Sequence, residues 1–163
     1  MSCTHDLEAL TKVVLNNLEN QHDWTETKVH TQPDLPRQII HGLPPKRLYV
    51  HPDEQIDIIR AEKARNGDRI PQPPELEWVL PLHIAEKWSP SRFAAVFDAL
   101  AAIPPGGNSL AQDLALDSGD ADAQWKLWRG PKRGKRLLLA TVQDDSTVTY
   151  YFMHDGIVKP RQN

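Results

Sequence analysis

The C-terminal part of this 163-residue chain constrains its fold most strongly, because two adjacent runs there are rich in aliphatic, β-branched and aromatic side chains. Residues 137–142 and 147–153 flank the polar segment 143–146, which is the pattern of a β-hairpin with a loop of about four residues. In the first run, Leu137 and Leu139 share one face and the even-numbered residues share the other. Both faces are apolar, so we predict a strand inside a sheet that is covered on both sides.

The chain continues for a few residues beyond this hairpin. Residues 154–156 have turn composition, and Ile157, Val158 and Lys159 can form one more short extended piece before Pro160 ends it. A terminal strand of this kind either closes the sheet of its own chain or offers an edge to another chain. The residue pattern alone leaves both alternatives open.

Three segments have the spacing of amphipathic helices, namely residues 4–20, 52–67 and 89–103. In the second of them, Pro52 stands in the first-turn position that proline favours, and Gly67 follows the last turn. We expect Ile56 and Ile59 of this helix to face the core.

The remaining segments are predicted as strands or connections. Residues 76–82 alternate between two faces and predict a strand, with Pro81 marking its end near an edge. Residues 24–31 and 46–50 are weaker strand candidates, and 33–45 is predicted as a connecting loop. Together with the helices, these strands predict an α/β (α+β) fold.

Composition limits the classes of function. The length suits a single domain over residues 1–163, and the formal net charge of −3 confines any nucleic-acid role to a local patch. Cys3 is the only cysteine, and no run of 18 apolar residues occurs, so we expect a soluble protein of a reducing compartment without membrane insertion. Residues 106–124 are acidic and of low complexity, and we expect a mobile loop there.

A basic run follows this acidic segment, interleaved with two tryptophans. Its candidates for contact with RNA phosphate are Lys132, Arg133, Lys135 and Arg136. The alternative, which we favour slightly, is that the tryptophans cap the core while the charges keep a strand edge soluble. The seven histidines show no paired spacing of metal ligands, and no glycine-rich phosphate loop is present. We therefore expect neither a metal nor a cofactor.

Several segments resemble a known family. Residues 144–151, followed by the turn at 154–156, resemble the small structural subunit of the eukaryotic tRNA-splicing endonuclease. Residues 76–81, with the helix at 89–103 behind them, look like the same family, and residues 47–55 look like its fungal branch. The resemblance covers roughly residues 43–103 and 134–163, and the acidic segment departs from it.

The resemblance implies a compact domain of the tRNA-intron-endonuclease type, with a mixed central sheet flanked by helices and a C-terminal hairpin plus terminal strand. It also implies a heterotetramer that removes introns from precursor tRNA, in which this chain pairs through its C-terminal strand with a catalytic paralogue. The interface residues that this pairing implies are Tyr151, Met153, Ile157, Val158 and Lys159. The family suggests the nucleus, or the cytosolic face of the mitochondrial outer membrane, as the location.

Catalytic members of the wider family are similar to one another in a Tyr–His–Lys triad, in which tyrosine acts as base, histidine as acid and lysine stabilises the transition state. Lys135 or Arg136 falls near the register of that lysine, but no histidine lies between His83 and His154 to serve as its acid. We therefore predict a non-catalytic subunit. Two alternatives remain: a nuclease with a displaced site formed by Tyr150, His154 and Lys135, and a free-standing RNA-binding homodimer.

Overall fold

The computed structural model describes residues 4–106, 123–130 and 132–156. Its helices are α1 (Thr4–Asn16), which continues into a π-helical turn (Asn17–Gln21), α2 (Pro52–Ala64), α3 (Pro90–Ala99) and α5 (Ala123–Lys126), which continues into a 3-10 turn (Leu127–Arg129). Its strands are β1 (Thr25–His30), β2 (Ile39–Leu43), β3 (Glu77–His83), β4 (Arg136–Val142) and β5 (Val148–His154). The predicted mixed sheet flanked by helices is confirmed.

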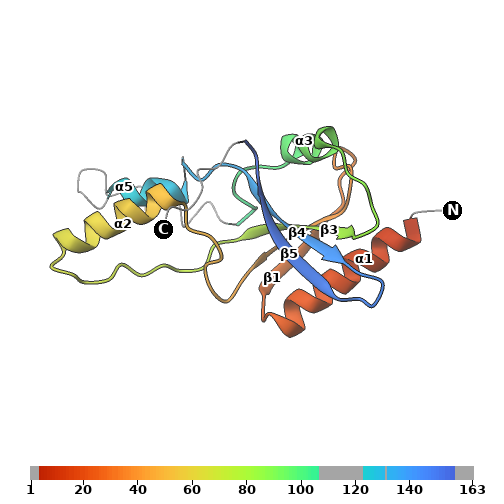
Figure 1. Ribbon diagram of the computed structural model, residues 1–163, viewed down its shortest axis with the longest axis horizontal. Coiled ribbons are helices and arrows are strands. Elements are labelled where there is room, and N and C mark those ends of the chain that lie inside the picture. The colour runs from red at the N-terminus through yellow and green to blue at the C-terminus, as the bar shows by residue number, and fades with distance from the viewer. Residues whose placement is uncertain (1–3, 107–122, 131, 157–163) are drawn as a thin grey trace.

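The five strands form one sheet in the order β1-β2-β3-β4-β5. The β3–β4 pair is parallel, with Val79 opposite Leu138, and the other neighbouring pairs are antiparallel. Figure 1 shows α1 against the sheet, α3 on its other side, and α2 beside α5 in a separate part of the molecule. The hairpin predicted at residues 143–146 joins β4 to β5, as expected.

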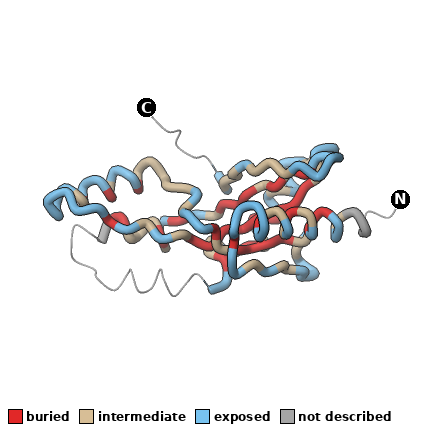
Figure 2. The backbone as a smooth tube through the Cα atoms, turned by 90° about the horizontal axis from the view of Figure 1, so that it is seen from below, coloured by how far each residue is buried: buried red, intermediate tan, exposed pale blue. Residues whose placement is uncertain are grey.

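Two apolar clusters cover the two faces of the sheet, and the buried strands run through the middle of the tube in Figure 2. Leu10, Val14 and Leu18 of the N-terminal helical segment pack on the face that carries Leu138 and Val142. The other cluster joins α3 to the face that carries Leu137, Leu80 and their neighbours. The prediction that β4 is covered on both sides is therefore confirmed. Within the described residues, no helix is long and apolar enough to cross a membrane.

Three local predictions were wrong. The connection predicted at 33–45 contains β2, a strand too short and too glycine-interrupted to show a periodic pattern, and residues 46–50 form no strand. Ile56 and Ile59 of α2 are 47% and 44% exposed, because α2 turns its other stripe inward, where Glu54, Ile58 and Ala61 are buried. The inward stripe includes the charged residue Glu54, and a prediction from hydrophobic spacing alone places such a residue at the surface.

Pro81 lies in β3, which is a central strand rather than an edge strand. The pairing of β3 with β2 runs from Glu77 to Val79, whereas its pairing with β4 continues past Pro81, which is opposite Ala140. Pro81 therefore lies beyond the end of the β2 pairing and has only β4 as a neighbouring strand. A residue that cannot donate a main-chain hydrogen bond is tolerated best at such a position.

The Gly42→Ala substitution is expected to destabilise the protein by about 1–3 kcal/mol, because a Cβ at Gly42 would lie 2.9 Å from Trp24 Cε3 and 3.0 Å from Thr27 Cγ2. Trp24 is buried and its ring is rigid, so the strand must shift. Urea denaturation measures the loss. Adding Thr27→Ser removes one of the two contacts and should recover part of the stability, whereas an unchanged urea midpoint for Gly42→Ala would contradict the close packing of β1 on β2.

Candidate functional site

The outer edge of β5 is the first candidate site. No strand of the described chain pairs with it, because β5 is the last strand in the sheet order. The Asp155 N–H donates to the Lys135 carbonyl and the Gln143 N–H to the Thr147 carbonyl, so odd-numbered residues form the hydrogen-bonded pairs with β4. The even-numbered residues of β5 (Val148, Tyr150, Phe152 and His154) therefore direct their main-chain N–H and C=O groups away from β4.

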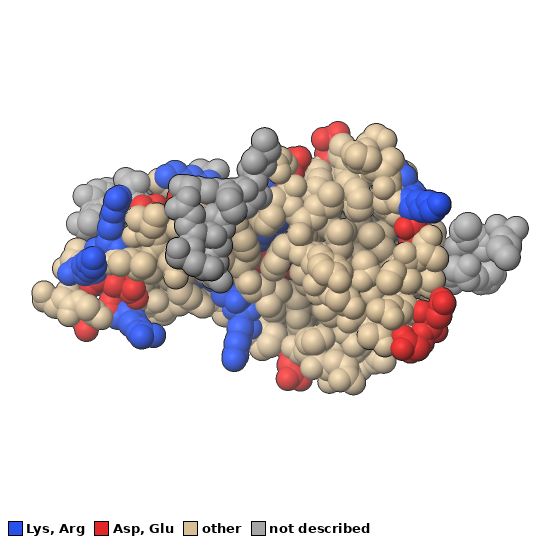
Figure 3. Space-filling view, in the orientation of Figure 1, with Lys and Arg blue, Asp and Glu red and all other residues tan. Residues whose placement is uncertain are grey.

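The side chains along β5 suit a contact with another protein. Tyr151 is 58% exposed, and Met153 is half-buried against the α3 cluster. The face over the sheet in Figure 3 is largely without charged side chains, which gather instead at its margins and over the part that contains α2. Depletion of charge at the centre is characteristic of protein interfaces. The other predicted interface residues, Ile157, Val158 and Lys159, lie outside the described residues.

A buried ionic cluster occupies the junction between the sheet and the α2–α5 part, and we call it the charge network. Arg136 of β4 donates from Nε to Glu77 Oε1 (3.0 Å) and from Nη2 to Glu77 Oε2 (2.7 Å) and Glu75 Oε2 (2.6 Å). Glu77 is fully buried, and Arg133 contacts both carboxylates. The members of the network are Arg47, Glu54, Glu75, Glu77, Arg129, Arg133 and Arg136.

Two of the predicted contacts with RNA phosphate, Arg133 and Arg136, are held by carboxylates of the protein itself. Both are nearly fully buried, and their guanidinium groups bind Glu75 and Glu77, which lie more than fifty residues earlier in the chain. A charge can be buried only with partners, and these carboxylates supply them. Lys132 is exposed, while the half-buried Lys135 donates from Nζ to the Phe97 carbonyl (2.8 Å).

Burial and the neighbouring charges both shift pKa values within the charge network. Burial alone would raise the pKa of Glu75, but the surrounding arginines hold it below its usual value. Burial raises the pKa of Glu54, although Arg47 opposes the shift. Burial together with neighbouring arginines lowers the pKa of Arg129 and of Arg133. Sequence analysis missed this network; its one available signal was Glu77, a carboxylate inside an otherwise apolar strand.

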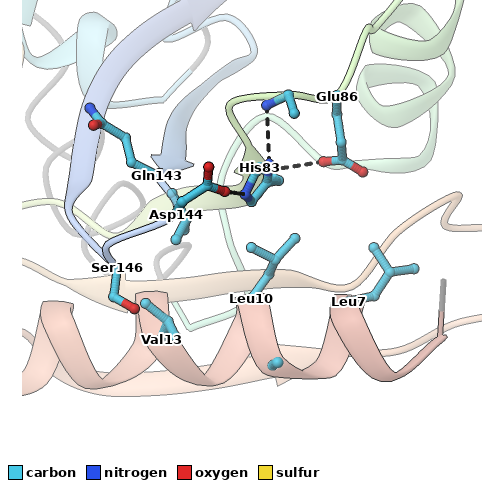
Figure 4. Close-up of a pocket in the computed structure, with 11 residues that line it drawn as sticks. Leu7, Leu10, Val13, His83, Glu86, Gln143, Asp144 and Ser146 are labelled. Atoms are coloured by element: carbon cyan, nitrogen blue, oxygen red, sulfur yellow. Dashed lines mark hydrogen bonds and ion pairs between the residues drawn. The ribbon is translucent and has the colours of Figure 1, made fainter.

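A groove of about 770 Å³ lies between α1 and the ends of β3 and β4 (Figure 4). His83 accepts at Nδ1 from the Ala85 N–H (3.1 Å), so its proton is on Nε2, which donates to Asp144 Oδ1 (3.0 Å). Glu86 accepts from the His83 main-chain N–H and pairs with Arg37. The histidine and the two carboxylates of the groove are thus already bound to groups of the protein, and both ring nitrogens of His83 are occupied.

Two histidines that are separate in the sequence meet across β1 and β2. His30 Nε2 lies 2.5 Å from His41 Nδ1, and both rings contact Trp78 edge-on. Burial lowers the pKa of each, and the nearby Lys28 adds to the shift. No spacing in the sequence indicated this pair, and within the described residues no group of three or more potential metal ligands exists.

This pair predicts a dependence of stability on pH. Because folding lowers both pKa values below 6.5, the unfolded chain binds more protons just below that pH. The free energy of unfolding is therefore expected to be highest above pH 6.5 and to fall as the pH is lowered from 6.5 through the pKa values of the folded state. Urea denaturation at pH 7.5 and 5.5 measures this. His30→Gln should flatten the dependence, while His22→Gln, outside the pair, should not; an equal effect of both would contradict the assignment.

The displaced catalytic site is not assembled. Tyr150 donates its hydroxyl to Asn17 Oδ1 (2.6 Å) and lines a cavity with Leu18 and Trp24, whereas His154 and Lys135 line a different cavity. Burial raises the pKa of the Tyr150 phenol, which opposes its use as a base.

Comparison with known proteins places this chain in a family. The model of the Sen15 protein family matches residues 13–122 and 112–163. A Neurospora crassa protein named "Probable tRNA-splicing endonuclease subunit tsp-1" is 72% identical over 163 residues, which are 100% of this chain and 70% of the relative. The Eremothecium gossypii "tRNA-splicing endonuclease subunit SEN15" is 27% identical over 157 residues, 96% of this chain and 93% of the relative.

A Schizosaccharomyces pombe protein named "Probable tRNA-splicing endonuclease subunit sen15" is 33% identical over 89 residues, 55% of this chain and 51% of the relative. The relatives are therefore fungal, and two of the three matches extend over nearly all of this chain. The family-model match likewise runs from the end of α1 to the C-terminus. The chain thus belongs to the Sen15 protein family.

Proposed function

We propose that this chain is a non-catalytic subunit of a tRNA-splicing endonuclease, and that it pairs through its C-terminal strand region with a catalytic paralogue. The names of its relatives support the role in tRNA splicing. The observation that carries the pairing is the outer edge of β5, which no other strand of the described residues covers and along which alternate main-chain groups are directed away from β4.

Edge pairing is a well-defined mode of recognition. A strand that lies along β5 would bind the main-chain groups of residues such as Tyr150 and Phe152, while exposed side chains such as Tyr151 select the partner. A long unpaired edge without such a partner promotes aggregation. The uncharged face beside β5 in Figure 3 would be covered in the same assembly.

The arrangement of the candidate catalytic residues supports the non-catalytic part of the proposal. Tyr150 and His154 line different cavities, and the Lys135 ammonium is bound to the Phe97 carbonyl. A general base and a general acid must both reach the reacting 2′-hydroxyl and the leaving oxygen. We therefore expect purified, folded protein to leave precursor tRNA intact, and cleavage that survives further purification would overturn this part.

Co-expression with each candidate catalytic paralogue tests the pairing. The full chain should co-purify with one of them, and removal of residues 157–163 should abolish or strongly reduce recovery of the complex. Circular dichroism and the urea midpoint of the truncated chain serve as the control for folding. Unchanged recovery of the complex after truncation, combined with unchanged recovery after disruption of β5, would contradict pairing through this region.

A further inference from the structure

A small polar cavity of about 170 Å³ lies where α2 begins and β5 ends, beside the turn that follows α5. We call it the histidine cavity. The side chains that matter for its chemistry are Tyr49, His51, Trp128, Lys132, Arg136 and His154. They come from segments that are far apart in the sequence, and the displaced catalytic site predicted from the sequence includes neither His51 nor Trp128.

His51 offers a pre-positioned hydrogen-bond donor to this cavity. It is the N-cap of α2, and its Nδ1 accepts from the Asp53 N–H (3.0 Å), so its proton is on Nε2. Its ring stacks on Trp128 at 4.5 Å between centroids, and Trp128 is held in turn by a hydrogen bond from Nε1 to Asp57 (2.9 Å). Among the described residues, His51 Nε2 has no hydrogen-bond partner.

Arg136 and His154 add further donors. Arg136 is nearly fully buried and uses Nε and Nη2 on the two glutamates, but its Nη1 has no hydrogen-bond partner in the described part of the chain. The Arg136 guanidinium carbon lies 5.3 Å from the centroid of Tyr49, which also packs against the His154 ring at 4.7 Å. Neither ring nitrogen of His154 is hydrogen-bonded to any residue that the structure describes.

The charge behind the cavity is unbalanced. The charge network contains four guanidinium groups and three carboxylates, an excess of one positive charge, and burial raises the pKa of one of these carboxylates, Glu54. Lys132 lies at the cavity with its Nζ 5.3 Å from the Trp128 ring, and it has no carboxylate partner among the described residues. Two carboxylates also line the cavity, but Glu54 is paired with Arg47 and Asp155 is exposed. A buried excess of positive charge is stabilised by an anion.

We propose that the histidine cavity binds one phosphate group, held by His51 Nε2, Arg136 Nη1, the Lys132 ammonium and His154. Phosphate presents several acceptor oxygens, and at pH 7 it carries between one and two units of negative charge when free and one when it is a diester. The bound phosphate group can belong to an RNA strand or be free phosphate. Only the RNA source rests on the proposed function.

Titration of the ¹⁵N-labelled full chain at pH 7 and constant ionic strength tests the proposal, with sodium phosphate in one arm and a short single-stranded oligoribonucleotide without terminal phosphates in the other. We expect the imidazole signals of His51 and His154 to shift in a saturable manner. Lys132→Ala should weaken binding about tenfold through the loss of one charge-assisted contact, and Lys132→Arg should retain most of it. His51→Asn keeps a good N-cap, so α2 should stay folded while binding weakens. Lys12→Ala, an exposed lysine on α1, is the control and should change nothing.

Saturable shifts with the oligoribonucleotide, with or without a response to sodium phosphate, show that the site accepts an RNA phosphodiester, and shifts with sodium phosphate alone identify free phosphate; each of these results supports the site. Absence of saturable shifts in both arms, or equal affinities for Lys132→Ala and Lys12→Ala, would overturn it. Co-purification of the Lys132→Ala chain with the catalytic paralogue separates the two proposals. The Lys132→Ala chain should lose phosphate binding but still pair with the paralogue. If the unmodified chain fails to pair with any paralogue, its phosphate titration should still show saturable binding.

Discussion

Glu77→Gln is expected to lower the free energy of unfolding by about 3–5 kcal/mol, the largest effect of any single polar substitution in this chain. Glu77 is fully buried and accepts hydrogen bonds from Arg136 and Arg133. Glutamine preserves the shape of the side chain but removes its negative charge. The positive excess of the charge network therefore rises by one, in a place that water cannot reach.

Urea denaturation of the full chain at pH 7 measures this loss, and Glu8→Gln provides a matched control. Glu8 is exposed on α1, and its neutralisation should change stability by less than about 0.5 kcal/mol. A loss below about 1 kcal/mol for Glu77→Gln would show that the network tolerates an unpaired guanidinium and would contradict its structural role.

Hydrogen exchange shows which part of the protein loses stability when the charge network is weakened. The charge network joins the segment before α2 (Arg47), α2 itself (Glu54) and the turn after α5 (Arg129) to the central strands of the sheet. Weakening the network should therefore increase exchange of α2 amides more than that of α3 amides, since α3 is held by its own apolar cluster. Equal increases in both helices would indicate global destabilisation instead.

Tyr151→Asp is expected to reduce affinity for the catalytic paralogue at least tenfold, and more if Tyr151 is an anchor at the centre of the interface. The side chain is 58% exposed on the free edge strand, so the substitution leaves the core of the isolated chain intact. An aspartate there would be desolvated when a partner strand binds beside it, and it would lack a pairing charge.

Ile84→Asp is the matched control, because Ile84 is equally exposed, at 58%, but follows β3 and lies away from the β5 edge. Quantitative co-purification, or titration of one labelled subunit with the other, compares the two variants. A result in which Ile84→Asp disrupts pairing while Tyr151→Asp does not would move the interface away from β5. Urea denaturation of each isolated variant shows whether a loss of pairing comes from unfolding.

Local patterns predicted the elements that local forces decide. Alternating apolar residues were sufficient for β4 and β5, and the polar segment between them marked the hairpin. The starts of α2 and α3 were also predicted, because Pro52 and Ser89–Pro90 act on the first turns of their own helices. By contrast, β2 was missed because its five residues contain a glycine and do not alternate between apolar and polar side chains.

The candidate sites were only partly predictable. Exposed Tyr151 and the edge position of β5 agree with the interface inferred from the resemblance, although the tail at residues 157–163 lies outside the described residues. The His30–His41 pair and the histidine cavity depend on contacts across strands and between distant segments. No spacing within a single segment can indicate such contacts.

For the basic run at residues 126–136, the sequence alone gives the charge of each side chain, whereas its burial depends on the folded structure. Composition established that this run carries enough positive charge to attract RNA, but an arginine has the same charge whether it faces solvent or the core. Arg133 and Arg136 face inward because parallel pairing of β3 and β4 brings them beside Glu75 and Glu77. Lys132 has no such carboxylate among the described residues and stays at the surface. Carboxylate partners that only the folded chain brings near decide which cations are held inside the structure, as Arg133 and Arg136 are, and which remain at the surface, as Lys132 does.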